Sequence, residues 1–87
     1  MKPSITDVPW HDVRAEVTRL LVGLLRLDTT NPPGNEILAA EYLADVLRAD
    51  GIEPTVLSSA PGRGNVVARL RGDGSAPPLL LMGHTDV

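Results

Sequence analysis

A histidine and an aspartate two positions apart, His84 and Asp86, are the side chains of this sequence best suited to chemistry. They directly follow an apolar run, Leu-Leu-Leu-Met at residues 79–82, with Gly83 between. In extended backbone, residues i and i+2 point to the same side, so both side chains can address one site. A carboxylate that accepts the second N–H of a ligating imidazole fixes its tautomer and raises its basicity. The spacing therefore suits one metal ligand and its orienting partner, and Gly83 leaves room for a close approach.

By itself a His-x-Asp pair is a weak signal, because a solvated pair at a strand end has the same sequence. Its position adds weight, since ligands of open α/β sheets collect beyond the carboxyl ends of strands. The other candidates favour structural roles. His11 stands at a predicted helix start, and Glu36 and Glu41 lie near a helix N-terminus, where acidic side chains complement the dipole. The Gly-Arg-Gly-Asn turn at 62–65 precedes a strand rather than a helix, so no phosphate site is predicted.

The first half of the chain predicts two amphipathic helices. Apolar residues recur at helical spacing over residues 10–27 and again over residues 35–50. The segment between them, residues 28–35, is dense in helix breakers and holds two successive prolines, which predicts a rigid connection. Gly51 stands where the end of the second helix favours left-handed backbone.

The second half predicts three short strands. Residues 55–57 and 65–70 are rich in β-branched side chains, and the Pro/Gly loop at 60–64 between them predicts an antiparallel pair. A second turn, residues 72–78, leads into residues 79–82, which are apolar on both faces and predict a central strand covered by helices. The order of two helices and then three strands predicts an α/β fold whose sheet is incomplete.

The length, charge and composition of the chain exclude several kinds of protein and site. A chain of 87 residues forms one small domain at most. Its 11 acidic and 8 basic residues give a net charge of −3, and the basic residues are scattered, so nucleic acid is not expected as a partner. The absence of cysteine excludes disulfides, thiolate metal sites and a cysteine nucleophile. The opening residues lack the apolar region of a secretory signal, and no apolar run approaches membrane-spanning length, so a cytoplasmic chain without a membrane partner is expected.

Three motifs resemble the zinc peptidases and amidohydrolases that include acetylornithine deacetylase, succinyl-diaminopimelate desuccinylase and bacterial glutamate carboxypeptidase. They are Leu-Asp-Thr-Thr-Asn-Pro-Pro-Gly-Asn-Glu at 27–36, Asn-Val-Val-Ala-Arg-Leu at 65–70 and Gly-His-Thr-Asp-Val at 83–87. They occur in the family's order and spacing, and the likeness covers nearly the whole chain from Val13 onward. The resemblance implies that residues 1–87 are an N-terminal fragment of a three-layer αβα, zinc-aminopeptidase-like catalytic domain.

By this resemblance, His84 is a ligand of one of two zinc ions, and Asp86 is the active-site carboxylate that orients it. The family uses two metal ions to activate a bridging water and to polarise an amide carbonyl while a glutamate moves the proton. The implied substrates are small peptides or N-acyl amino acids, and cobalt or manganese could replace zinc. A lid domain dimerises the family's enzymes, so a homodimeric parent is implied. The family's other ligands and its glutamate lie downstream, and one ligand does not hold zinc, so the 87 residues alone are expected to be inactive.

Three other interpretations fit the sequence less well. The metallo-β-lactamase fold requires a histidine two positions before His84, where this chain has Met82. Related single-domain zinc aminopeptidases share the strand-end His-x-Asp, although the Asn-Pro-Pro-Gly-Asn-Glu stretch argues against them. The non-enzymatic alternative is a finished remnant or interaction module. An apolar strand at residues 79–82 with an unpaired edge favours a fragment over that alternative.

Overall fold

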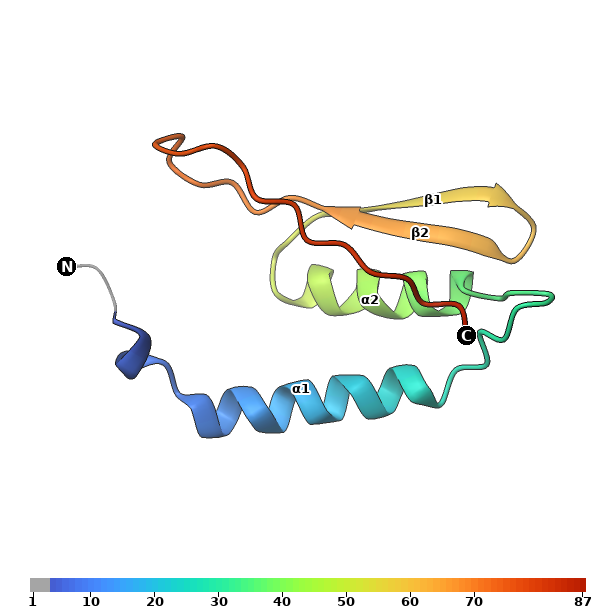
Figure 1. The fold of residues 1–87 in the computed structure, drawn as a ribbon, viewed down its shortest axis with the longest axis horizontal. Helices are drawn as coiled ribbons and strands as arrows, with labels where there is room; N and C mark the ends of the chain where they lie inside the picture. The colour runs from blue at the N-terminus through green and yellow to red at the C-terminus, as the bar shows by residue number, and fades with distance from the viewer. Residues whose placement is uncertain (1–3) are drawn as a thin grey trace.

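The computed structural model describes residues 4–87. Its elements are a short 3-10 helix η1 (Ile5–Asp7), the helices α1 (Trp10–Leu25) and α2 (Ile37–Ala49), and the strands β1 (Pro54–Ala60) and β2 (Arg63–Ala68). Figure 1 shows α2 between α1 and the β1–β2 hairpin, with the C-terminal segment running back toward the α1–α2 connection. The chain is thus a small α/β structure with two α-helices and a two-stranded antiparallel sheet, as the sequence predicts for residues 10–68.

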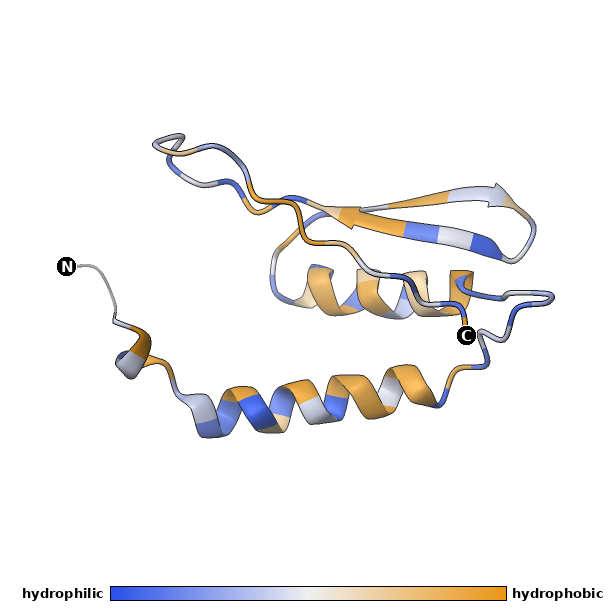
Figure 2. Cartoon of the chain, viewed as in Figure 1, coloured by the Kyte–Doolittle hydropathy of each residue, from blue (hydrophilic) through white to orange (hydrophobic). Residues whose placement is uncertain are grey.

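The helix α1 is attached to the rest of the chain by few contacts. Much of its apolar side faces α2 in Figure 2, yet none of its residues is buried. Leu25, for example, is 75% exposed. One direct link is the Tyr42 hydroxyl, which donates to the Leu20 carbonyl at 3.3 Å and lies against Gly23. Neither α1 nor any other helix within residues 4–87 is long and apolar enough to cross a bilayer.

The end of α2 confirms the predicted role of Gly51. Its φ of 78° is left-handed, a conformation that glycine adopts without steric cost. The Gly51 N–H donates to the Arg48 carbonyl at 3.0 Å, and the Ile52 N–H donates to the Leu47 carbonyl at 2.9 Å. These two bonds add to those that the Asp50 N–H makes to the same two carbonyls, and together they close the C-terminal end of α2. The start of α2 differs from the prediction, because Glu36 rather than Asn35 or Gly34 occupies the N-cap position, and no side chain caps the helix.

The small core lies between α2 and one face of the hairpin. Its buried side chains are Ala39, Ala40 and Ala44 of α2, and Pro54 at the start of β1 is buried as well. β1 and β2 pair in an antiparallel register that sets Val56 opposite Val66, and both of these side chains are part-buried. On the opposite face of the hairpin, Leu57 and Val67 remain about half exposed, at 53% and 54%. The hairpin is therefore covered on one face within residues 4–87.

Gly64 permits the close approach of β2 to α2. It is buried, and a Cβ added there would lie 3.0 Å from the Ile37 Cα, which belongs to backbone and cannot rotate away. We expect Gly64→Ala to lower the free energy of unfolding by about 1–3 kcal/mol, as overpacked cores do. Urea unfolding would measure the loss. Gly72→Ala is the matched control, because a Cβ there meets nothing within 4 Å; equal unfolding midpoints for the two variants would contradict the packing argument.

The predicted third strand at residues 79–82 is not formed. The four side chains are 79–88% exposed, and no strand is assigned between residues 69 and 87. The physical reason is pairing: a strand is defined by hydrogen bonds to a neighbour, and these residues make no backbone hydrogen bond to β1 or β2 in the described chain. The segment is visible in Figure 2 as the orange stretch that passes near the end of β2, before the more polar C-terminal residues cross in front of α2.

Candidate metal-ligand site

The segment that carries the His-x-Asp pair is anchored by the α1–α2 connection. The Val87 N–H donates to the Thr29 carbonyl at 3.2 Å, and the Asn31 N–H donates to the Val87 carbonyl at 2.8 Å. The Thr29 hydroxyl donates to the Thr85 carbonyl at 2.6 Å. Thr29 is itself buried, at 5% exposure. Asp86 is therefore flanked on both sides by residues that bond to the connection.

The structure brings His84 and Asp86 into direct contact. The His84 Nδ1 lies 3.2 Å from the Asp86 Oδ1 and 3.0 Å from the Asp86 carbonyl oxygen. The side chain of His84 is 84% exposed, whereas that of Asp86 is 33% exposed. The contact between the imidazole and the carboxylate two positions later, which the sequence predicts, is thus present in the fold.

The second carboxylate oxygen of Asp86 is held by Asn31. The Asn31 side-chain amide donates from Nδ2 to the Asp86 Oδ2 at 3.1 Å. This hydrogen bond, followed by the one from His84, lowers the pKa of Asp86 below its ordinary value, because both stabilise the charged form. The carboxylate is therefore ionised at neutral pH and acts only as an acceptor.

The acceptors around the His84 Nδ1 determine which nitrogen of the neutral ring carries the proton. A carbonyl oxygen and an ionised carboxylate oxygen both accept, so Nδ1 must be the N–H donor. The proton on Nδ1 leaves the Nε2 lone pair free on a highly exposed side chain. Metal-bound histidines usually donate their other ring N–H to a carboxylate or a carbonyl in this way. The pair therefore has the donor chemistry of one metal ligand with its orienting partner.

The described residues do not by themselves assemble a complete metal site. Within residues 4–87, no three His, Cys, Asp or Glu side chains lie close enough together to hold an ion. Both oxygens of Asp86 are engaged, by His84 and by Asn31, so His84 is the donor that this pair presents. A catalytic zinc needs about three protein ligands. The remaining ligands of any such site would have to come from elsewhere.

An ion pair between Glu36 and Arg63 joins the start of α2 to the hairpin turn. The Arg63 Nε donates to the Glu36 Oε1 in a short contact, while the buried Glu36 Oε2 has no partner among the described residues. Glu36 is only 8% exposed. Gly34, with a φ of 73°, lies against this pair, and a Cβ there would approach both side chains. Glu36 thus lies at the start of α2, as the sequence predicts, and the structure adds that it is a buried ion-pair partner of Arg63.

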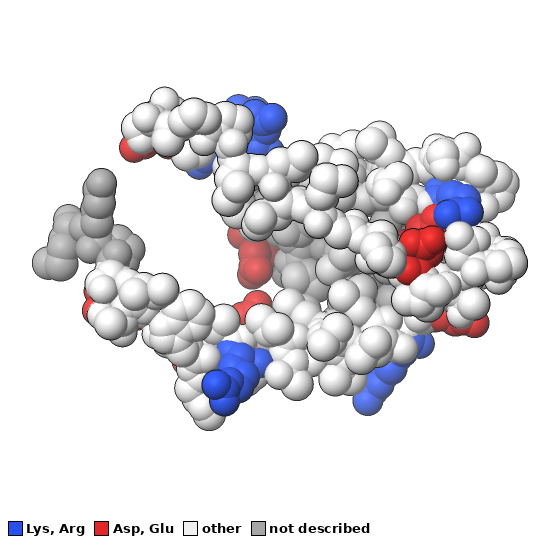
Figure 3. All heavy atoms as spheres, in the orientation of Figure 1, with Lys and Arg blue, Asp and Glu red and all other residues white. Residues whose placement is uncertain are grey.

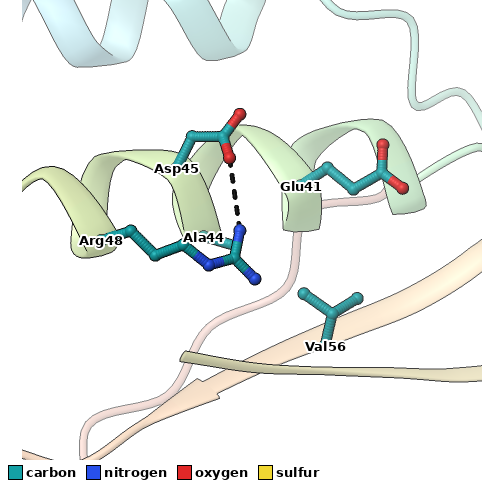
Figure 4. A pocket seen from close by; sticks show the side chains of 5 residues that line it. All are labelled: Glu41, Ala44, Asp45, Arg48 and Val56. Atoms are coloured by element: carbon teal, nitrogen blue, oxygen red, sulfur yellow. Dashed lines mark hydrogen bonds and ion pairs between the residues drawn. The ribbon is translucent and has the colours of Figure 1, made fainter. Parts of the chain in front are cut away.

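The shallow hollow in Figure 4 offers no second candidate site. It lies between α2 and β1, and its lining residues are Glu41, Ala44, Asp45, Arg48 and Val56. Arg48 already pairs with Asp45 at 3.3 Å, through side chains that are 51% and 80% exposed. Such exposed pairs are weak, and the hollow contains neither histidine nor a buried charge. On the face drawn in Figure 3, Lys and Arg side chains lie in separate places rather than in one patch.

Two residues of the site were not predicted from the sequence. Thr29 and Asn31 were assigned to a rigid connection, yet they bond to Thr85 and Asp86 from 56 and 55 positions away. No local spacing links such distant residues. The only sequence signal was that residues 27–36 and 83–87 both carry the family resemblance, and this did not indicate that the two motifs touch.

Comparisons with protein-family models, with curated proteins and with solved structures found no match for this chain.

Proposed function

We propose that these residues form the first part of the catalytic domain of a dinuclear-metal hydrolase that cleaves amide bonds in small peptides or N-acyl amino acids. His84 is one metal ligand, and Asp86 is the carboxylate that orients it. The observation that carries the proposal is the direction of the imidazole: Nδ1 faces two acceptors of Asp86, which leaves the exposed Nε2 free to coordinate.

Two further features support an incomplete αβα domain of the zinc-aminopeptidase type. The hairpin has one face without a cover among residues 4–87, on which Leu57 and Val67 stay half exposed. The apolar residues 79–82 are almost fully exposed directly before the candidate ligand. Both would be explained by a larger sheet with helices on each face. The parent enzyme would be homodimeric, as the family resemblance implies, and its location would be the cytoplasm that the sequence analysis expects.

The chemistry would come from metal ions held by His84 and by ligands outside these 87 residues. Bound zinc, or cobalt or manganese in its place, lowers the pKa of a coordinated water and polarises an amide carbonyl. In that arrangement His84 donates its Nε2 lone pair, and Asp86 keeps the Nδ1 proton in place. The 87 residues alone supply neither a general base nor enough ligands, so they would be inactive.

A non-catalytic interaction module is the second candidate. In such a module the exposed run at residues 79–82 would be the contact surface, because contiguous apolar surface of this kind marks contacts with other protein. A fragment of a single-domain zinc aminopeptidase is the enzymatic alternative, and it shares the role proposed for His84.

The deciding experiment is to read the gene downstream of the Val87 codon and to assay its complete product. We expect an open frame that encodes a lone Asp, a Glu-Glu pair and a further His. The purified product should contain zinc, should hydrolyse members of a panel of N-acyl amino acids and dipeptides, and should lose activity with a chelator and regain it with added zinc. A stop codon directly after Val87, or a longer product that neither binds zinc nor hydrolyses any amide, would leave the interaction module as the better explanation.

A further inference from the structure

We propose that Asn31 is a positioning residue for the candidate ligand: by holding one oxygen of Asp86, it directs the other oxygen to the His84 Nδ1 and so presents Nε2 outward. The inference deepens the proposed function and rests on it for the identity of the ligand as a metal ion. Asn31 acts through Asp86, since its recorded contact is with the carboxylate and not with the imidazole.

The two carboxylate oxygens of Asp86 have different partners. Oδ2 accepts from the Asn31 Nδ2 at 3.1 Å, and Oδ1 faces the His84 Nδ1 at 3.2 Å. A carboxylate two positions from a histidine can otherwise turn about its side-chain bonds toward solvent, where water satisfies both oxygens. The amide of Asn31 opposes that rotation, because its NH₂ group can only donate and Oδ2 can only accept.

Hydrogen bonds between the two segments place Asn31 beside Asp86. The Asn31 N–H donates to the carbonyl of Val87, and the Val87 N–H donates to the carbonyl of Thr29. The buried Thr29 hydroxyl then reaches the Thr85 carbonyl. Three hydrogen bonds thus join residues 29–31 to residues 85–87, and the Asn31 side chain is brought to the carboxylate from a fixed base.

The tautomer of the His84 ring distinguishes a positioning role of Asn31 from a merely structural one. A residue that only attached the C-terminal segment would affect stability but would not set the protonation of the ring. If Asn31 directs Asp86, the neutral His84 ring must carry its proton on Nδ1, which is the less common tautomer of a free histidine side chain. The tautomer therefore reports on how the Asp86 carboxylate is directed, and not on whether the C-terminal segment is attached.

The test uses the metal-free, ¹⁵N-labelled 87-residue chain at a pH where imidazole is neutral, with two-bond ¹H–¹⁵N correlation spectra of the His84 ring. We expect the Nδ1–H tautomer in the wild type. Asn31→Ala should raise the fraction of the Nε2–H tautomer, because the Asp86 carbonyl would be the one acceptor still directed at Nδ1. Asn31→Asp should do the same, because aspartate keeps the shape but cannot donate. The matched control is Asn65→Ala, since Asn65 is an exposed asparagine on β2, where the structure gives its side chain no hydrogen bond.

The inference is overturned if the wild-type ring is Nε2–H, whatever the cause, or if neither Asn31 variant raises the Nε2–H fraction above that of the wild type. Amide spectra show whether each variant is folded. A positioning role leaves α2 and the hairpin intact, so loss of dispersed amides in both Asn31→Ala and Asn31→Asp would also count against it and in favour of a structural role.

The complete gene product separates this inference from the proposed function. There, Asn31→Ala should weaken zinc binding by about 10-fold, toward the lower end of the effect of removing residues that orient a ligand. A tautomer that responds to Asn31 in a protein that binds no metal would retain the positioning role and refute the hydrolase. A zinc enzyme whose His84 tautomer does not change in the Asn31 variants would retain the hydrolase and refute the positioning role.

Discussion

Replacing His84 by alanine is expected to leave the complete gene product without measurable amide hydrolysis and with zinc affinity reduced by more than about 100-fold. The reason is the ligand count: a catalytic zinc normally has about three protein ligands, so one loss removes a large part of the donor set. Asp86→Ala should have a smaller effect, about 10–100-fold in zinc affinity, because it removes the orienting carboxylate and leaves the donor.

Zinc content by atomic absorption and affinity by chelator competition would measure both effects. The matched control is His11→Ala, because His11 is an exposed histidine in the first turn of α1. We expect that variant to bind zinc and hydrolyse substrate like the wild type. Retained activity in His84→Ala, or equal losses in the two histidine variants, would show that His84 is not a ligand.

Replacing Arg63 by alanine is expected to lower the free energy of unfolding of the chain by about 3 kcal/mol. The change removes the partner of Glu36 and leaves a buried carboxylate whose Oε2 already lacks a hydrogen bond. Breaking a buried ion pair from one side costs about 3–5 kcal/mol, and the lower end applies because the Arg63 side chain is 36% exposed.

Urea unfolding followed by circular dichroism would measure the loss. Arg48→Ala is the control, because its pair with Asp45 lies in solvent and should contribute less than about 0.5 kcal/mol. The double variant Glu36→Gln with Arg63→Met should recover part of the lost stability, since it leaves no buried charge without a partner. Equal losses for Arg63→Ala and Arg48→Ala would show that burial does not distinguish the two ion pairs.

The local elements of the fold could be predicted from the sequence, because their causes are local. Helical spacing identified all four ends of the two helices to within about two residues. The left-handed Gly51 confirmed the C-terminal signal of α2. The hairpin was predicted from β-branched runs separated by Pro61 and Gly62, and the structure confirms its antiparallel pairing. The contact between His84 and Asp86 also follows from near neighbours in sequence.

The rest depended on residues far apart in sequence. Residues 79–82 have the composition of a central strand, but a strand also needs a partner, and composition does not show whether one is present. The partners of Asn31 and of Glu36 were missed for the same reason, since Asp86 and Arg63 lie 55 and 27 positions away from them. Proline and glycine around these residues indicate a turn, which describes the backbone and not what its side chains reach.

The hydrogen bonds between residues 29–31 and residues 85–87 also set an order of events during synthesis. Asn31 leaves the ribosome 55 residues before Asp86, which at about 5–20 residues per second is an interval of about 3–11 s. Helices and hairpins form in microseconds, so α2 and the hairpin have time to fold around Glu36 and Arg63 before the His84–Asp86 segment emerges from the ribosome. Among these 87 residues, the imidazole thus emerges after Thr29 and Asn31, which hold its segment in place.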